Sequence, residues 1–373
     1  MAEPAPPAAP QITGFGYVRP LGSGGFAHVY LYEQDMPRRV VAVKVLEGGL
    51  HTPRDRSDFE AEADAMARLS SHPSIVSVWD AGISADGKPY IAMEYCPDSM
   101  RDRTRGAPAR LDAVLDAGVR LAGALETAHR AEVLHRDIKP SNVLIATTGR
   151  PALADFGISM LRGRGSSEDK ARAMSIPWAA PEVVSNATTG TVASEIWALG
   201  ATLYTFAAGR SPFERADRTL NTQAKMVARI MKAKYTPVPG AQGYAPFDAA
   251  MARAMSLRPE ERFASMRELA EALQQLQRQY GFDVTPLDLV DTGWVTPAAP
   301  AVGTRTPAAP AVRQTSRAQQ RAERRAAELP QDRDGVIRDR PASPMTAGLI
   351  GAGIAVLAIA GLAGVALLAG WIG

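Results

Sequence analysis

Two short clusters of acidic, amide and lysine side chains lie near the middle of the chain. The first runs from His135 to Asn142 and contains Asp137 and Lys139, and the second is Asp155-Phe156-Gly157. Amide and carboxylate oxygens are the hard ligands that Mg²⁺ prefers, and a carboxylate placed beside a hydroxyl group can accept its proton. Side chains of these types could therefore bind a metal ion or accept a proton.

A glycine-rich run, Leu21 to Val29, precedes these clusters. Gly22 and Gly24 lack Cβ atoms, so their backbone N–H groups can approach a phosphate closely. Taken alone, the run fits an ordinary hairpin equally well. A dinucleotide-binding motif does not fit, because that motif opens a helix, whereas the residues that follow continue as a strand.

Lys44 ends the apolar run Val41-Ala42-Val43 and follows Gly22 by 22 residues. It could extend along the edge of a sheet towards solvent, or it could face phosphates. The next predicted helix offers two carboxylates, Glu60 and Glu62, as ion-pair partners. Glu62 is preferred because it shares a helix face with the apolar residues that follow.

These runs, with Ala180-Pro181-Glu182, occur in the order and spacing that resembles the bacterial Ser/Thr protein kinases of eukaryotic type, over residues 15 to about 280. The resemblance implies an α+β, bilobal fold with a β-rich N-lobe at about 15–95 and a helical C-lobe at about 96–281. The patterning agrees: strand-like runs at 30–32, 40–46, 75–78 and 90–93 precede helical runs from 111, at 193–208 and at 265–279.

The resemblance assigns roles to individual residues. It makes Asp137 the base, Lys139 and Lys44 phosphate-contacting catalytic residues, and Asn142 and Asp155 the ligands of Mg²⁺, with Mn²⁺ as an alternative ion. The ATP site would comprise Leu21, Gly22, Ser23, Gly24, Gly25, Val29, Ala42, Lys44, Glu62, Met93, Glu94, Cys96 and Asp98.

Within that site, Met93 resembles the gatekeeper, and the backbones of Glu94 and Cys96 resemble the hinge that binds adenine. Asp98 is expected to reach the ribose. By the same resemblance, His135 is a packing residue, and Arg136 binds a phosphate group on the activation segment. Cys96, the only cysteine, is expected to be packed rather than reactive.

The chain departs from the family pattern at four positions. Ala27 replaces a third glycine, Ser175 a threonine, and Trp178 a tyrosine. Glu195 stands where the family has an aspartate that braces the catalytic loop, and it is expected to act as a longer aspartate. Arg262 resembles the buried arginine that pairs with the glutamate of Ala-Pro-Glu, here Glu182.

Two alternatives to an active kinase remain at this point. A pseudokinase would bind nucleotide without transferring phosphate, and only Glu195 favours it. A membrane-tethered scaffold would depend on its linker more than on catalysis. Because the residues that hold phosphate and metal are present, transfer of the γ-phosphoryl group of ATP to Ser/Thr hydroxyls of protein substrates is preferred, with activation by autophosphorylation of the activation segment.

Outside the kinase-like region, the chain changes texture. Residues 1–14 are rich in Pro and Ala and predict a disordered tail that is not a secretory signal, and residues 282–345 predict a disordered linker with a repeated TPAAPAV. Residues 346–372 carry no charge and are long enough for a transmembrane helix. The arginines before it predict a single-pass protein of the cell membrane with a cytoplasmic kinase domain.

The composition narrows the expected partners. The net charge of +3 over 373 residues gives no basic face for nucleic acid, so none is expected. Membrane lipid is expected to contact the C-terminal helix. Ala360 and Gly364, four residues apart, allow two such helices to pair in a homodimer.

Overall fold

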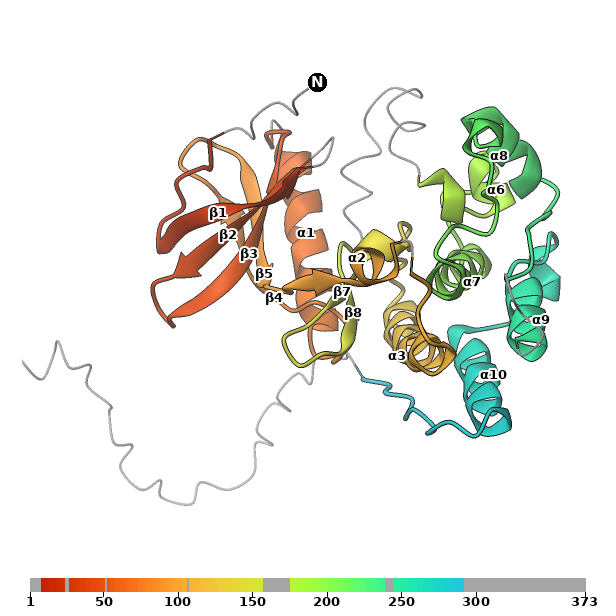
Figure 1. Ribbon diagram of the computed structural model, residues 1–373. Helices are drawn as coiled ribbons and strands as arrows, with labels where there is room; N and C mark the ends of the chain where they lie inside the picture. Colours follow the sequence, from red (N-terminus) through yellow and green to blue (C-terminus); the bar gives the residue numbers. More distant parts are fainter. Residues whose placement is uncertain are drawn as a thin grey trace, which may run out of the picture. The chain divides into compact units, whose positions relative to one another are not determined.

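The computed structural model describes residues 8–23, 27–50, 52–105, 107–156, 175–238 and 244–291. All of them belong to the first of two units, Met1–Thr296. Within this unit, a sheet-rich lobe precedes a helical lobe (Figure 1), so the predicted α+β, bilobal fold is confirmed. The predicted transmembrane helix lies outside the described residues, and no helix within them is long and apolar enough to span a membrane.

The N-lobe is a five-stranded antiparallel sheet with one long helix, α1, beside it (Figure 1). The strand order is β1-β2-β3-β5-β4. Thr52 caps α1 through a reciprocal capping box with Asp55, and Pro53 opens the first turn. The elements are β1 (Phe15–Ser23), β2 (Ala27–Gln34), β3 (Arg39–Leu46), α1 (Pro53–Leu69), β4 (Val78–Ile83) and β5 (Pro89–Glu94).

The strand predicted at 75–78 is therefore displaced. The structure starts β4 at Val78, whereas Ile75 makes a single bridge to Leu153 of the other lobe. Ile75 and Val76 are buried in the loop between α1 and β4. A short apolar run that is buried in a loop has the same sequence pattern as a buried strand, which explains the wrong prediction.

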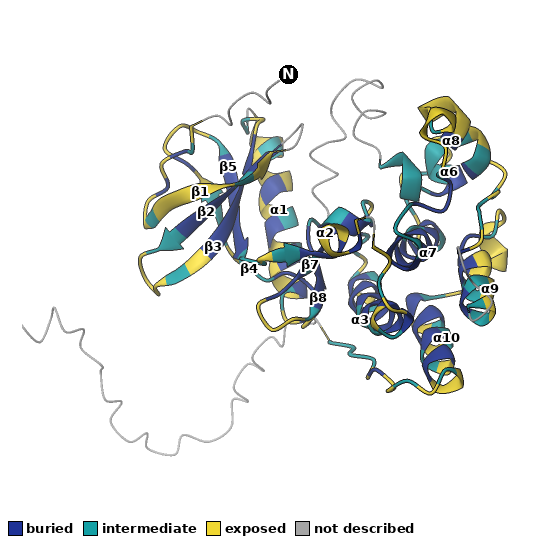
Figure 2. Ribbon diagram, viewed as in Figure 1, coloured by how far each residue is buried: buried dark blue, intermediate teal, exposed yellow. Residues whose placement is uncertain are grey.

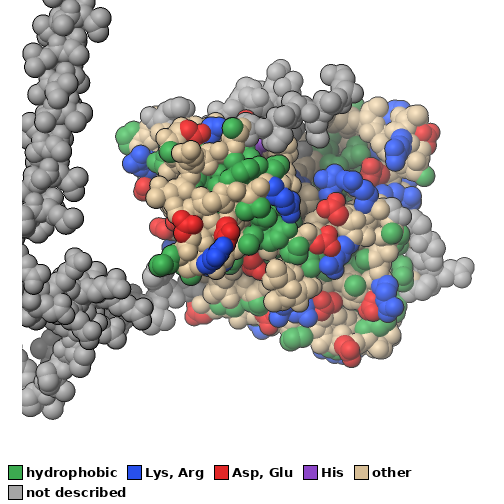
Figure 3. All heavy atoms as spheres, turned by 60° about the vertical axis from the view of Figure 1, so that its left-hand side comes forward, with side chains coloured by type: hydrophobic (Ala, Val, Ile, Leu, Met, Phe, Trp, Pro, Cys, Tyr) green, Lys and Arg blue, Asp and Glu red, His purple; other side chains and the backbone are tan. Residues whose placement is uncertain are grey.

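Side chains alternate between the two faces of the sheet, as the pleat of a strand requires. Ala42 and Met93 lie in the large core that the N-lobe shares with the C-lobe. Tyr32 and Val41 belong to a second, smaller core on the outer face. Hydrophobic side chains also gather on the surface of the side that carries the sheet (Figure 3). The exposed large hydrophobic residues of β1, β3 and the turn before β3 are Tyr17, Val18, Met36 and Val40.

The N-terminal residues 8–14 correct the prediction of a disordered tail over 1–14. Pro10 and Ile12 are buried on the outer face of the sheet. The hydroxyl of Tyr32 donates to the carbonyl of Pro10 at 2.6 Å, and the N–H of Ala85 donates to the carbonyl of Gln11 at 3.0 Å. The Pro/Ala-rich composition hid this because the partner, an aromatic sheet face, comes later in the sequence. Residues 1–7 lie outside the described ranges.

The C-lobe packs its helices around α3 and α7, both of which are largely buried (Figure 2). A three-stranded sheet, β6-β7-β8, joins the lobes. The elements are β6 (Asp98–Ser99), α2 (Met100–Thr104), α3 (Leu111–Arg130), η1 (Pro140–Asn142), β7 (Val143–Ile145), β8 (Pro151–Leu153), η2 (Ile176–Trp178), α6 (Pro181–Val184), α7 (Val192–Ala208), η3 (Arg218–Leu220), α8 (Gln223–Ile230), α9 (Ala245–Ala254), η5 (Pro259–Glu261) and α10 (Met266–Gln279).

The folded part extends beyond the predicted boundary at residue 281. Residues 282–291, assigned from sequence to the linker, lie against α10 and α3, and Thr285 is 5% exposed. Phe282 and Leu287 pack against the core, and the other contacts are hydrogen bonds and ion pairs, so the segment has no periodic apolar face. That is why a sequence pattern did not reveal them.

Candidate active site

The carboxylate of Asp137 is held from two sides. Ser175 Oγ donates to Asp137 Oδ1 at 2.7 Å, and Lys139 Nζ contacts Asp137 Oδ2 at 2.7 Å. Lys139 Nζ also donates to Ser175 Oγ at 2.9 Å, which closes a triangle of polar groups. Ser175, which replaces the family's threonine, thus keeps a hydroxyl group beside Asp137. The arrangement fixes a half-buried carboxylate beside a lysine, as a base and a phosphate-stabilising cation require.

Asn142 and Asp155 lie next to this triangle. The side-chain amide nitrogen of Asn142 donates to the carbonyl of Asp137 at 2.8 Å, which leaves the amide oxygen as its metal-ligating atom. Asp155 Oδ1 pairs with Lys44 Nζ at 2.7 Å. Lys44 is only 3% exposed, so its ammonium group is buried at the inner face of β3 and needs a nearby negative charge.

Asp155 is also one of the few non-glycine residues with a positive φ, at 69°, and Arg136 is another, at 65°. The left-handed region is unfavourable for side chains with a Cβ, and surrounding contacts must hold them there. Asp155 is itself a predicted metal ligand, and Arg136 directly precedes Asp137. The unfavourable backbone conformations therefore occur at Asp155 and just before Asp137, where they set the direction of the two carboxylates.

His135 confirms the packing role expected of it. It is fully buried, and its ring centre lies 4.5 Å from that of Phe156. Its Nδ1 accepts from the N–H of Asp137 at 3.3 Å, so Nε2 carries the proton that is donated to the carbonyl of Ala154 at 3.0 Å. Burial lowers the pKa of His135, which favours this neutral form.

Glu195 braces the catalytic loop as predicted. Its Oε1 accepts from the backbone N–H of Arg136 at 2.6 Å. Its Oε2 lies 2.7 Å from His129 Nε2, a contact that sequence reasoning missed. Glu195 is 2% exposed, and the extra methylene is accommodated by this second partner at the end of α3. A histidine in the last turn of α3 was the available signal.

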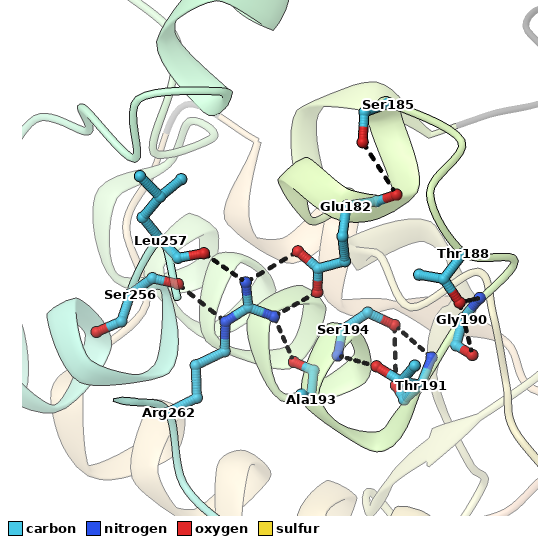
Figure 4. Close-up of polar contacts among 10 residues, drawn as sticks. All are labelled: Glu182, Ser185, Thr188, Gly190, Thr191, Ala193, Ser194, Ser256, Leu257 and Arg262. Atoms are coloured by element: carbon cyan, nitrogen blue, oxygen red, sulfur yellow. Dashed lines mark hydrogen bonds and ion pairs between the residues drawn. The ribbon is translucent and has the colours of Figure 1, made fainter. Parts of the chain in front are cut away.

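A second buried pair confirms the predicted role of Arg262 (Figure 4). The guanidinium group donates to both carboxylate oxygens of Glu182, at 2.6 and 3.0 Å. It also donates to the carbonyls of Ala193 and Ser256, at 2.9 Å each. A two-pronged arginine–carboxylate contact fixes orientation as well as distance. The pair ties α6, which follows the activation segment, to α7 and to the end of α9.

The apolar half of the nucleotide site is assembled by strand register. Ala42 and Lys44 are two residues apart and lie on one face of β3. Met93 of β5 lies opposite Ala42, and Val29 of β2 lies opposite Lys44. Ala42 and Met93 are buried, and Val29 packs against the same core. The register thus places an apolar surface next to Lys44.

The predicted hinge residues follow β5 directly. The N–H of Glu94 donates to the carbonyl of Ser77 at 2.8 Å, which fixes the end of the strand. Burial, with a smaller effect from Glu94, raises the pKa of the Cys96 thiol to about 12. Since the thiolate is the reactive form, Cys96 is a packed residue, as expected.

The remaining predicted residues are distributed around this site. Leu21 packs against the large core, Gly22 and Ser23 are exposed at the end of β1, and Gly24 and Gly25 lie outside the described residues. The carboxylate of Asp98 contacts Arg103 at 2.6 Å, so its predicted contact with ribose remains a prediction.

The pairing of Lys44 with Glu62 also remains a prediction, since the ion pair that the structure shows for Lys44 is with Asp155. Glu62 is half-buried on α1, whereas Glu60 is exposed. This difference supports the preference for Glu62.

The model of the protein kinase domain matches residues 15–276, about 70% of the chain. The chain belongs to the protein kinase family. Its pattern of catalytic side chains, described above, is the one that this family places between two lobes.

Similar proteins narrow the class. The serine/threonine-protein kinase PknK of Mycobacterium tuberculosis is 38% identical over 291 residues, which cover 76% of this chain and 25% of PknK. PknF of the same species is 33% identical, covering 70% of this chain and 56% of PknF. The crystal structure of the PknI kinase domain, also from Mycobacterium tuberculosis, matches 72% of this chain and 98% of that chain, with a TM-score of 0.53 and 29% identity.

The chain thus spans about a quarter of PknK and just over half of PknF. Residues 15–276 form a bacterial Ser/Thr protein kinase domain of eukaryotic type.

This kinase family uses ATP and Mg²⁺, and the residues present fit both. Asn142 and Asp155 supply oxygen donors, and Lys44 supplies a buried cation beside the apolar surface described above. When bound, Mg²⁺ neutralises phosphate charge and orients the γ-phosphoryl group. With ATP and Mg²⁺ bound, Asp137 would hold the substrate hydroxyl and accept its proton, and Lys139 would stabilise charge on the transferred group.

Proposed function

We propose that the whole chain is an active Ser/Thr protein kinase, anchored in the cell membrane and activated by phosphorylation of its activation segment. The polar triangle of Asp137, Lys139 and Ser175 carries the proposal of activity, because a scaffold has no need of a base held at 2.7 Å from both its partners. Transfer of labelled phosphate from Mg-ATP to a Ser/Thr substrate tests it. A pseudokinase would bind ATP without transfer.

Activation is proposed to depend on Ser166 and Ser167, which lie outside the described residues. The observation that motivates it is Arg136, whose side chain is exposed and, in the described part of the chain, makes no ion pair. Its backbone N–H is bound by Glu195, so the residue is fixed while its guanidinium group remains available. A phosphoserine offers the charge that such a group binds.

We expect phosphate on Ser166 or Ser167 in purified wild-type protein, and its absence in Asp137→Asn. Replacing both serines with alanine should lower kcat on the order of tenfold, because one or two charge-assisted hydrogen bonds are lost. Arg136→Ala should lower kcat similarly, and combining it with the serine changes should add little. Mass spectrometry and steady-state kinetics provide the readouts. Full activity of a wild-type protein with no phosphate here would contradict this mechanism.

Anchoring is proposed from residues 346–372, which are outside the described ranges. About 20 apolar residues cross the hydrocarbon of a bilayer, and this run exceeds that length. The arginines that precede it favour a cytoplasmic kinase domain, where ATP is present: they are Arg313, Arg317, Arg321, Arg324, Arg325, Arg333, Arg338 and Arg340. Pairing of two helices through Ala360 and Gly364 would bring two kinase domains together.

Fractionation tests the anchor. The full chain should need detergent for extraction from membranes, whereas a chain that ends after Arg340 should be recovered in the soluble fraction. A second variant, Leu357→Arg, places one charge near the middle of the run. The charge raises the free energy of insertion by roughly 2.5–3.5 kcal/mol, so part of the protein should move to the soluble fraction. Recovery of the unmodified full chain without detergent would contradict the proposal.

A further inference from the structure

The chain does not leave the kinase domain at the end of α10. Gly281, with a φ of 72°, turns it back, and residues 282–291 (the C-terminal strap) run beside α3 towards β8 (Figure 1). The first half is fixed by Thr285: its N–H donates to Gln277 Oε1 at 3.0 Å, and its hydroxyl donates to Asp116 Oδ1 at 2.8 Å.

The second half of the strap contacts three separate elements, two of them through Asp288. The backbone carbonyl of Asp288 lies 3.1 Å from His72 Nε2, in the loop that follows α1. Its carboxylate pairs with Arg150 at 2.5 Å, at the turn before β8. Two residues on, the N–H of Val290 donates to the hydroxyl of Thr127 of α3 at 3.3 Å. Asp288 therefore connects an N-lobe loop to the turn before β8, and Val290 connects the strap to α3.

Gly123 shows that α3 is shaped to receive the strap. A Cβ at this position would lie 2.5 Å from the carbonyl oxygen of Asp288 and 3.1 Å from Leu287 Cδ1. Glycine is among the least favourable residues inside a helix, so its presence here needs a packing reason. The close approach of the strap backbone supplies that reason.

A short chain of bonds leads from Asp288 to the catalytic groups. His72 Nδ1 accepts from the N–H of Ser74 at 3.1 Å, so His72 Nε2 carries the proton donated to Asp288. The carbonyl of Ser74 accepts from the N–H of Leu153 at 2.9 Å. Leu153 ends β8, two residues before Asp155. On its other side, His72 follows α1, the helix that carries Glu62, by three residues.

We propose that Asp288 is a positioning residue of this kinase. Through the strap, it holds the loop after α1 and the strand β8 in the arrangement that aims Asp155 and Lys44 at Mg-ATP. The inference rests on the proposed activity of the whole chain, but its first consequence is the affinity for nucleotide, which is measured without phosphate transfer. Loss of the strap contacts should weaken ATP binding while the domain stays folded.

The test uses the full chain with Gly123→Ala, which pushes the strap away without touching the ATP site. We expect the Kd for Mg-ATP to rise roughly threefold or more, and amide hydrogen exchange at Val76 and Leu153 to accelerate. The matched control is Gly48→Ala, because a Cβ at Gly48 has no neighbour within 4 Å. Alanine is more favourable than glycine inside a helix, so Gly123→Ala should not weaken α3 itself. Unchanged ATP affinity and unchanged hydrogen exchange in this variant would overturn the proposal.

A double-mutant cycle guards against a general effect of Gly123→Ala on folding. Arg150→Ala and Asp288→Ala should each raise the Kd for Mg-ATP, and the double variant should resemble either single one, because both remove the same contact. If these variants lower only the melting temperature, the strap stabilises the domain and positions nothing. If the wild type transferred no phosphate but these variants still raised the Kd for Mg-ATP, the proposed activity would be wrong and the positioning role of Asp288 would stand.

Discussion

Replacing Asp137 with asparagine is expected to lower the rate of phosphoryl transfer roughly 10²–10⁴-fold, the usual contribution of a positioned base. Asparagine keeps the size of the side chain but cannot accept the substrate proton. It also disturbs the polar triangle, because an amide NH₂ group would face either Ser175 Oγ or Lys139 Nζ, which now contact the two carboxylate oxygens at 2.7 Å.

The measurement is kcat for phosphate transfer to a Ser/Thr substrate, with the Kd for Mg-ATP measured in parallel. Affinity for nucleotide should change little, because Asp137 is assigned to the hydroxyl and not to the metal. Asp112→Asn is the matched control, since Asp112 lies on the surface at the start of α3. Wild-type turnover in Asp137→Asn would show that another group accepts the proton, and the mechanism given above would be wrong.

The resemblance to kinases pointed to residues that the structure brings together, because the spacing of these residues is short and fixed. Asp137, Asn142 and Asp155 lie on short segments around β7 and β8, where a few residues of separation leave little freedom. Alternation along β3 places Ala42 and Lys44 on one face, and this follows from the strand alone. These parts of the site were predictable because local rules decide them.

The parts that were missed depend on contacts between distant residues. Glu195 was recognised as a brace, but its contact with His129 joins two helices, 66 residues apart in the sequence. The contact of Asp288 with His72 spans 216 residues and uses a backbone carbonyl, which no side-chain pattern reveals. Likewise, Ile12 is buried only because an aromatic sheet face, formed later in the chain, needs covering. Composition predicted disorder at both places.

Removing the carboxylate of Glu195 by Glu195→Ala is expected to be the most damaging change outside the catalytic groups. Both carboxylate oxygens are used, one by the N–H of Arg136 at 2.6 Å and one by His129 at 2.7 Å. The side chain of Glu195 is 3% exposed and that of His129 is 8%, so water cannot readily replace the lost acceptor. An unpaired buried group of this kind costs roughly 2–4 kcal/mol in the free energy of unfolding.

Glu195→Ala should also lower kcat, beyond its effect on folding, because Arg136 is held at a φ of 65° and directly precedes Asp137. Without an acceptor for its N–H, this backbone can relax to a more favourable conformation and carry the catalytic carboxylate with it. A displacement of about 1 Å at a reacting group can cost on the order of 10²-fold in rate. We therefore expect kcat to fall at least tenfold at a temperature where Glu195→Ala is still folded.

Three further variants separate the two contacts of Glu195. His129→Ala keeps the acceptor for Arg136 and should cost stability with little loss of kcat. Glu195→Asp keeps a carboxylate, so it should be close to neutral and much milder than Glu195→Ala. Glu271→Ala controls for losing a glutamate, because that side chain is 59% exposed on α10. If Glu195→Ala matched the wild type in melting temperature and kcat, the strained backbone at Arg136 would have to be held by the packing of His135 against Phe156 instead.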